Sequence, residues 1–229
     1  RGSLVISMGY NRILNYDSFM SFSGFSLQEN TLDFPIDVDG KEEYHLFSKK
    51  VHRSERALSN GGMEQLTFSF GIAFTPTISG GFSISRITGR EDYEFNFSQE
   101  DLQNTYTSFP ADFKQYDLTQ SLITKMSGWN FRGGMNATLN KRGQFGVALS
   151  LPYTIEVKEN HKTDEVLTFD NGDLSDSTLI GYYDYQVRAP MIFDVGFAIT
   201  VESLAISSSF RYKNWGSTQF KLNDVDSNS

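Results

Sequence analysis

The chain of 229 residues contains no cysteine, which excludes disulfide scaffolds, thiol catalysis and cysteine-bound metal centres. Its net charge of -8, without a concentrated basic segment, argues against nucleic-acid binding. Aromatic residues make up 14% of the chain, yet the mean hydropathy is -0.38 and no segment approaches the roughly 18 apolar residues of a spanning helix.

The main pattern is an alternation of large apolar residues with small or polar ones. In residues 66–74, Leu, Phe or Ile at every second position interleaves with Thr, Ser, Gly and Ala. This alternation is typical of strands whose two faces differ in chemistry. It predicts seven strands, near residues 3–12, 64–75, 78–97, 122–140, 143–159, 180–201 and 203–222.

The predicted connections alternate between short and long. Tight turns are expected at 75–77, 141–143 and 202–203, and long polar loops at 13–62, 98–121 and 160–178. Outer-membrane barrels have short periplasmic turns and long external loops. The pattern therefore predicts that the short turns lie on the periplasmic side.

Together these features predict an all-β fold, a transmembrane antiparallel up-and-down β-barrel that forms one domain over residues 1–229. An odd number of strands fits a piece of a larger barrel, because complete bacterial barrels have an even number. Residues 1–3 run straight into a strand and residues 224–229 resemble a loop, so we expect the barrel to be incomplete at both ends. A soluble all-β binding module is disfavoured, because its Phe-rich strand faces would aggregate in water.

The expected strand at 78–97 breaks the alternation. Its apolar residues change parity between Ile84 and Ile87, with Arg86 between them. Because a cation facing lipid costs about 2–4 kcal/mol, we expect a bulge near Ser85 and Arg86 that turns Arg86 inward. The bulge would either open the barrel wall or simply adjust its shape.

The small or polar parity of the strands predicts a charged lumen. We expect this lumen to be a water-filled channel or to hold a plug. Its predicted lining is Asn130, Arg132, Asn136, Glu156, Lys158, Asp194, Arg211 and Lys213, with Arg188 nearby. A separate aromatic girdle at the external strand ends is expected from Tyr10, Tyr93, Phe95, Phe97, Trp129, Tyr182, Tyr183, Tyr185, Tyr212 and Trp215.

The sequence favours no enzyme, cofactor or metal site. The three histidines, His45, His52 and His161, are expected in loops and far apart, so no wall-borne Ser-His-acid arrangement is predicted. Residues 37–40 and 170–173 resemble parts of calcium loops but lack the Glu that completes such a loop.

Three segments resemble FadL/TodX-type outer-membrane transporters of hydrophobic compounds, especially their Bacteroidetes branch. They are SMGYNRILNYD at 7–17, the hairpin from GWNFRGGM at 128–135 to FGVALSLPY at 145–153, and YQVRAP at 185–190 with the hairpin that follows. The resemblance implies fourteen strands in the complete barrel, an N-terminal hatch in the lumen, and passive uptake of long-chain fatty acids or similar molecules. From this resemblance we expect the hatch and the last strands to lie outside residues 1–229.

The resemblance also implies a location in the bacterial outer membrane, among its lipids, and capture of fatty acids or other hydrophobic small molecules by apolar external loops. Candidate ligand-binding residues are Phe19, Phe22, Phe25 and Leu27 in the first long loop, together with Arg86, Arg132 and Arg188. Two alternatives stay open: an outer-membrane scaffold or secretion-associated barrel of the same family, and a general porin.

Overall fold

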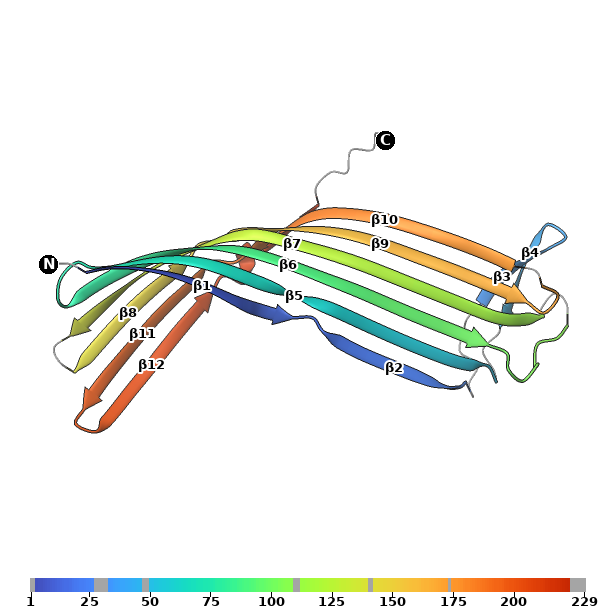
Figure 1. Cartoon of the computed structure of the whole chain (residues 1–229), viewed down its shortest axis with the longest axis horizontal. Helices are drawn as coiled ribbons and strands as arrows, with labels where there is room; N and C mark the ends of the chain where they lie inside the picture. Colours follow the sequence, from blue (N-terminus) through green and yellow to red (C-terminus); the bar gives the residue numbers. More distant parts are fainter. Residues whose placement is uncertain are drawn as a thin grey trace, which may run out of the picture.

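The computed structural model describes residues 3–26, 33–46, 50–108, 112–139, 142–172 and 174–222. These residues form antiparallel β-strands joined by turns and loops, with one 3₁₀ turn at Trp215–Ser217. The predicted all-β, up-and-down fold is confirmed, and the sheet is open (Figure 1). Among the described residues, no helix is both long enough and apolar enough to span a bilayer.

The main sheet has the strand order β1-β5-β6-β7-β8-β11-β12, to which β2, β9, β10 and β13 are also paired. A separate hairpin pairs β3 with β4. The strands are β1 (Leu4–Asn15), β2 (Ser18–Phe25), β3 (Asp33–Val38), β4 (Lys41–Leu46), β5 (His52–Ala73), β6 (Ile78–Glu100), β7 (Phe113–Leu139), β8 (Gly143–Ser150), β9 (Tyr153–Phe169), β10 (Leu174–Ala189), β11 (Ile192–Val201), β12 (Leu204–Lys213) and β13 (Gln219–Leu222).

Several strands follow one another end to end. β1 and β2 both pair with β5, and β8 and β9 both pair with β7. In the same way β11 and β10 lie along β8 and β9, and β12 and β13 lie along β11 and β10. The sheet thus has seven long strand courses, which match the seven predicted strands. The connections β5–β6, β7–β8 and β11–β12 gather at one end, on the left of Figure 1.

The predicted long loops are wrong in most of their length, because strands continue through them. β5 begins at His52, β6 continues to Glu100 and β9 continues to Phe169. Residues 18–25 form β2 rather than part of a loop. These segments resemble loops in composition because one strand face is charged and the other is only partly apolar. The extra length builds a second half of the sheet, the extension, on the right of Figure 1.

The left half of the sheet has one apolar face. Side chains of directly paired residues on neighbouring strands point to the same face. By the observed pairing, most large apolar residues of the left half share one face, which we call the outer face. Ser, Gly, Ala, Thr and polar residues, together with Val5 and Ile192, share the opposite, inner face. We call the following residues of the outer face the outer apolar belt: Leu4, Ile6, Met8, Tyr10, Leu66, Phe68, Phe70, Ile72, Ile78, Phe82, Ile84, Trp129, Phe131, Met135, Phe145, Val147, Leu149, Phe193, Val195, Phe197, Ile199, Ile206, Phe210 and Tyr212.

Glycines let the strands of the left half approach closely. A Cβ on Gly81 would lie 2.5 Å from the carbonyl oxygen of Phe70, and one on Gly134 would lie 2.9 Å from that of Val147. Both contacts are with backbone atoms, which cannot move aside as a flexible side chain can. Gly81 and Gly134 therefore permit a curvature of the sheet that any larger residue would oppose.

The apolar side chains change face where the left half meets the extension. Four courses change through an irregularity: a bulge at Ile13, and breaks at 151–152, 190–191 and 214–218. Along β7, four steps from Gly128 to Arg132 oppose five steps from Ser150 to Ile155, so one extra residue is inserted near Pro152. The courses of β5, β6 and β7 remain continuous, and there the sequence alternation itself changes parity.

The predicted bulge at Arg86 is wrong. β6 pairs with β5 and β7 without a register shift along its length, so Arg86 stays on the outer face. Its guanidinium lies 5.3 Å from the ring centroid of Trp129, at the edge of the outer apolar belt. At this edge the aromatic ring stabilises the cation and its stem can extend away from the belt, so no inward turn is required.

The predicted inward positions of Glu156 and Lys158 are also wrong. The extra residue near Pro152 moves both side chains to the outer face and brings Ile155 and Val157 to the inner face. Arg188, opposite Thr154, lies on the outer face for the same reason. The prediction failed because it extended one parity through the whole course.

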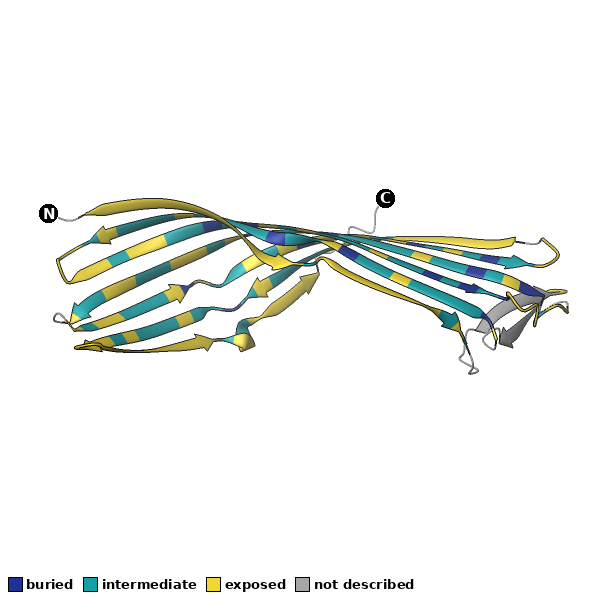
Figure 2. Ribbon diagram, turned by 60° about the horizontal axis from the view of Figure 1, so that its bottom comes forward, coloured by how far each residue is buried: buried dark blue, intermediate teal, exposed yellow. Residues whose placement is uncertain are grey.

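A compact apolar core lies at the tip of the extension. It consists of Val51, Phe97, Phe113, Tyr116 and Leu167, with Phe95, Tyr106, Leu118 and Phe169 packed around it. Val51 and Phe113 are fully buried. Figure 2 shows buried residues in the middle of the sheet and in the extension, whereas the edges of the left half are mostly exposed.

We expect Phe113→Ala to lower the free energy of unfolding of the extension by about 3–5 kcal/mol, because it leaves a cavity in this core. The measurement is denaturant-dependent protease cleavage of the extension. Phe22→Ala is the matched control, since Phe22 is 56% exposed and its loss leaves no cavity. Equal costs for the two variants would contradict the assigned core.

Candidate functional site

A continuous apolar surface crosses the inner face of the sheet where the extension begins. We call it the inner apolar band: Leu14, Met63, Ile87, Met126, Ile155, Val157, Tyr185, Val187, Phe220 and Leu222. Its central members are covered, with Ile87 1%, Val157 5% and Met63 7% exposed, whereas Phe220 and Leu222 at its edge are each 62% exposed. The inner face is therefore apolar where the extension begins and polar in the adjoining left half.

Tyrosines add polar groups to the inner apolar band. The Tyr185 hydroxyl donates a 2.7 Å hydrogen bond to Glu159, and the Tyr185 ring lies 4.7 Å from that of Phe220. Burial, together with the Glu159 carboxylate, raises the pKa of Tyr185 to about 12. Tyr16 lies 3.7 Å from the sulfur of Met126, and burial and the charge of Glu91 raise its pKa. These phenols are therefore neutral at ordinary pH.

The inner face of the left half carries a charged cluster. Asp194 of β11 accepts hydrogen bonds from Arg211 of β12 at 2.6 Å and from Arg132 of β7 at 3.0 Å. Arg132 reaches Asp194 across β8, where the intervening inner residue is the small Ala148. One carboxylate between two guanidiniums leaves a net positive charge. The cluster borders a hollow of about 660 Å³ lined also by Gly146, Gly196 and Ser209.

The structure separates the predicted ligand-binding residues. Arg132 lies on the inner face as expected, in the cluster with Asp194. Arg86 and Arg188 lie on the outer face, and so do not join Arg132.

The four predicted capture residues are also separated. Phe22 is on the inner face of the edge strand β2, whereas Phe19 and Phe25 are on its outer face. Phe19 packs beneath the guanidinium of Arg56, 5.8 Å from the ring centroid. Leu27 lies outside the described residues. The predicted group therefore does not form one groove.

Three of the residues predicted for the aromatic girdle lie together on the outer face. Tyr10, Trp129 and Tyr212 close the outer apolar belt on the side of the extension. The others are displaced: Tyr93, Phe95, Phe97, Tyr183 and Tyr185 are on the inner face, Tyr182 is on the outer face farther along the extension, and Trp215 is in the 3₁₀ turn. Their ordinary strand preference explains these positions.

Sequence reasoning missed the inner apolar band. Its signal was present in the parity change after Arg86, which Met63 and Met126 repeat on the neighbouring strands. Aligning these changes across β5, β6 and β7 would have indicated a change of face shared by adjacent strands. The flanking strands gave no such signal. Their bulge and breaks change the face of the apolar residues, while the alternation in the sequence continues unchanged.

The histidines are in strands rather than loops, which corrects the prediction. His45 falls within β4, His52 within β5 and His161 within β9. The Ser23 hydroxyl lies 3.0 Å from Nε2 of His52, and the Thr163 hydroxyl lies 3.2 Å from Nε2 of His161. Neither pair includes a carboxylate. No group of three His, Asp or Glu residues could hold a metal ion within the part of the chain that the structure describes.

Comparison with known proteins found no family model and no curated protein that matches this chain.

The two strongly shifted phenols predict a pH effect. The pKa values of Tyr116 and Tyr185 are both raised to about 12, mainly by burial, whereas an unfolded tyrosine has a pKa of about 10. The unfolded chain therefore loses these protons first, and the free energy of unfolding should fall between pH 10 and 12 and be unaffected by them below about pH 10. Denaturation followed against pH should show a shallower fall for Tyr185→Phe. An unchanged slope would contradict the prediction.

For the charged cluster, we expect Asp194→Asn to lower the free energy of unfolding by about 1–2 kcal/mol, because two guanidiniums lose their anion. Arg132→Gln should cost less, since the pair of Asp194 with Arg211 remains. Urea unfolding of both variants measures the difference. Equal costs would show that Asp194 does not join the two arginines energetically.

Proposed function

We propose that this chain forms part of the wall of an outer-membrane β-barrel that takes up hydrophobic molecules, such as long-chain fatty acids, by passive transport. The observation that carries the proposal is the inner apolar band. A general porin lines its water-filled lumen with polar residues, so an apolar band across several strands favours hydrophobic ligands. The resemblance to FadL/TodX-type transporters supports the same substrate class.

The outer apolar belt supports the membrane part of the proposal. On β7 the belt residues run from Trp129 to Met135 and the same face continues to Leu139, eleven residues in all, close to the roughly 9–11 residues of a tilted membrane-spanning strand. Its face is mainly apolar, while the opposite face is mainly small or polar. This all-β arrangement fits a membrane, and the short turns at one end favour the outer membrane with those turns in the periplasm.

The two inner surfaces suggest a route for the ligand. A hydrophobic molecule bound at the inner apolar band would next meet the polar inner face and the cluster of Arg132, Asp194 and Arg211. The hydrocarbon chain of a ligand gains no free energy by moving from the inner apolar band to this polar face, because apolar groups are stabilised by leaving polar surroundings. The band is therefore proposed as a holding site rather than the start of a polar channel.

Uptake of a fluorescent long-chain fatty acid by cells that make the full-length protein tests this function. Val187→Asn with Phe220→Asn places polar groups in the inner apolar band, and we expect uptake to fall at least tenfold, since each buried apolar side chain is worth about 1.5–3 kcal/mol. Ile180→Asn with Tyr182→Asn is the matched control on the outer face of the same strand region.

Cell fractionation and gel mobility with and without boiling establish whether each variant is folded in the outer membrane. A folded band variant with normal uptake would reject the proposal and favour the scaffold or porin alternatives. Loss of uptake in the control alone would show that the ligand depends on the outer face, and would contradict a holding site at the inner apolar band.

A further inference from the structure

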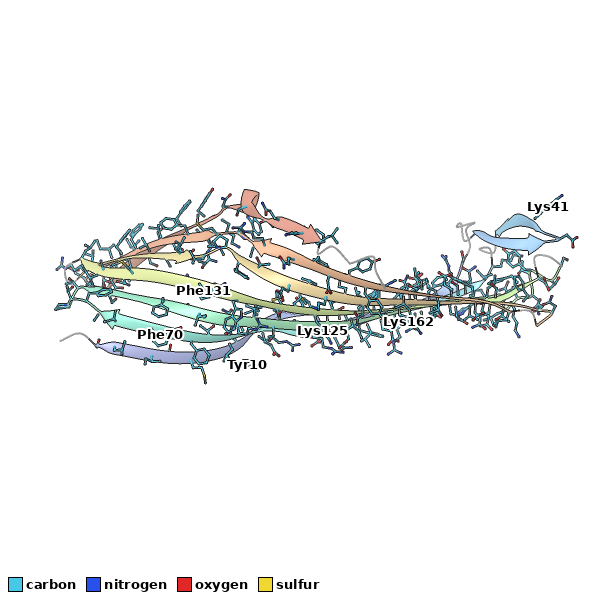
Figure 3. All side chains as sticks on the ribbon, turned by 90° about the horizontal axis from the view of Figure 1, so that it is seen from above. Tyr10, Lys41, Phe70, Lys125, Phe131 and Lys162 are labelled. Carbon is cyan, nitrogen blue, oxygen red and sulfur yellow. The ribbon has the colours of Figure 1, made fainter. Side chains whose placement is uncertain are left out.

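Three cations form a row on the outer face of the extension. Arg90 of β6 lies directly opposite Lys125 of β7, which lies directly opposite Lys158 of β9. Strands are about 4.8 Å apart, so the row spans about 10 Å of backbone. Figure 3 labels Lys125 near the middle of the long axis and Lys162 farther toward the tip.

This row is not explained by the stability of the sheet. Like charges directly opposite each other on neighbouring strands are destabilising. Arg90 pairs with Asp92 at 2.7 Å and Lys158 pairs with Asp184 at 3.3 Å. Lys125, between them, forms no ion pair within 4.0 Å with a residue that the structure describes, although, beside the hydrogen bond from Arg90, its charge helps to lower the pKa of Asp92. The Lys125 side chain is exposed. Two aspartates beside three cations leave one net positive charge in a chain of net charge -8, and an anionic partner would neutralise this local excess.

The row lies close to the outer apolar belt. Lys125 is four residues from Trp129, the last belt residue of β7, which is about 13 Å along the strand. A strand tilt of about 45° reduces this distance to about 9 Å in height. Polar headgroups extend about 5–8 Å beyond each side of the hydrocarbon core, so flexible lysine side chains reach that depth. Arg188 adds a charge on the same face, where Arg12 also lies but pairs with Asp17 at 3.9 Å.

We propose that the row of Arg90, Lys125 and Lys158 binds the phosphate groups of anionic lipid headgroups in the membrane leaflet on the extension side. This inference rests on the membrane placement in the proposed function, but not on uptake. Cations near a membrane surface attract anionic lipids, with a contribution equivalent to about fivefold in affinity for each Lys or Arg. The exposed ammonium of Lys125 is the centre of the site.

The test titrates the purified full-length protein, in neutral detergent micelles, with diphosphorylated lipid A, and counts bound lipid by native mass spectrometry. K125Q/K158Q should weaken binding about 25-fold. R56Q/K162Q is the matched control, because it removes the same charge from the outer face nearer the tip. The control should bind as the wild type does, and raised salt should weaken the wild type more than K125Q/K158Q.

Two further arms identify the source of the phosphate. Lipid A stripped of phosphate should bind as weakly to the wild type as lipid A binds to K125Q/K158Q, and inorganic phosphate should not compete at concentrations similar to those of the lipid. Equal binding by the two double variants, or strong competition by inorganic phosphate, would overturn the inference. Fractionation and fatty-acid uptake are measured on the same variants. Normal uptake without lipid A selectivity rejects only the lipid site, and selectivity without uptake rejects only the transport function.

Discussion

A β-strand places successive side chains on opposite faces, and the whole structure depends on this constraint. A sheet can change the chemistry of a face partway along only if the sequence changes its alternation or a residue is inserted. This protein uses both means at one place. β5, β6 and β7 change their alternation, and the flanking courses insert or skip residues near Ile13, Pro152 and Pro190. The outer apolar belt and the inner apolar band are two consequences of the same change.

The change divides the sheet into two regions, the left half and the extension, whose faces differ in chemistry. In the left half the outer face is apolar and the inner face holds small residues around Arg132, Asp194 and Arg211. In the extension the outer face carries charges such as Arg90 and Lys125, and the inner face is partly apolar, with Glu55 and Glu91 among its apolar residues. Such a distribution suits a barrel wall that contacts lipid along the left half and water along the extension. Its inner surface is apolar only in the extension.

The sequence predicted the fold class, the seven strand courses and the two faces of the left half, because Phe70 and its neighbours alternate without interruption. It did not predict the extension, since strands with charged faces resemble loops in composition. Nor could it place Glu156 and Lys158, because a one-residue bulge at Pro152 reverses every later side chain while leaving the pattern apparently regular. Of the candidate site residues within the described part of the chain, only Arg132 and Phe22 lie on the inner face, because strand alternation separates Phe22 from Phe19 and Phe25.

The difference between continuous and interrupted courses has a mechanical consequence. β5, β6 and β7 are joined by unbroken hydrogen-bond ladders from the short turns to the tip, so this part of the sheet resists bending. On one side the ladders are interrupted at Pro152 and Pro190, which cannot donate a backbone hydrogen bond, and on the other side by the bulge at Ile13. A force on the tip would therefore be transmitted through the three central strands, while the flanking strands bend at their interruptions. Any tilt of the extension would widen or narrow the inner surface at the height of the inner apolar band.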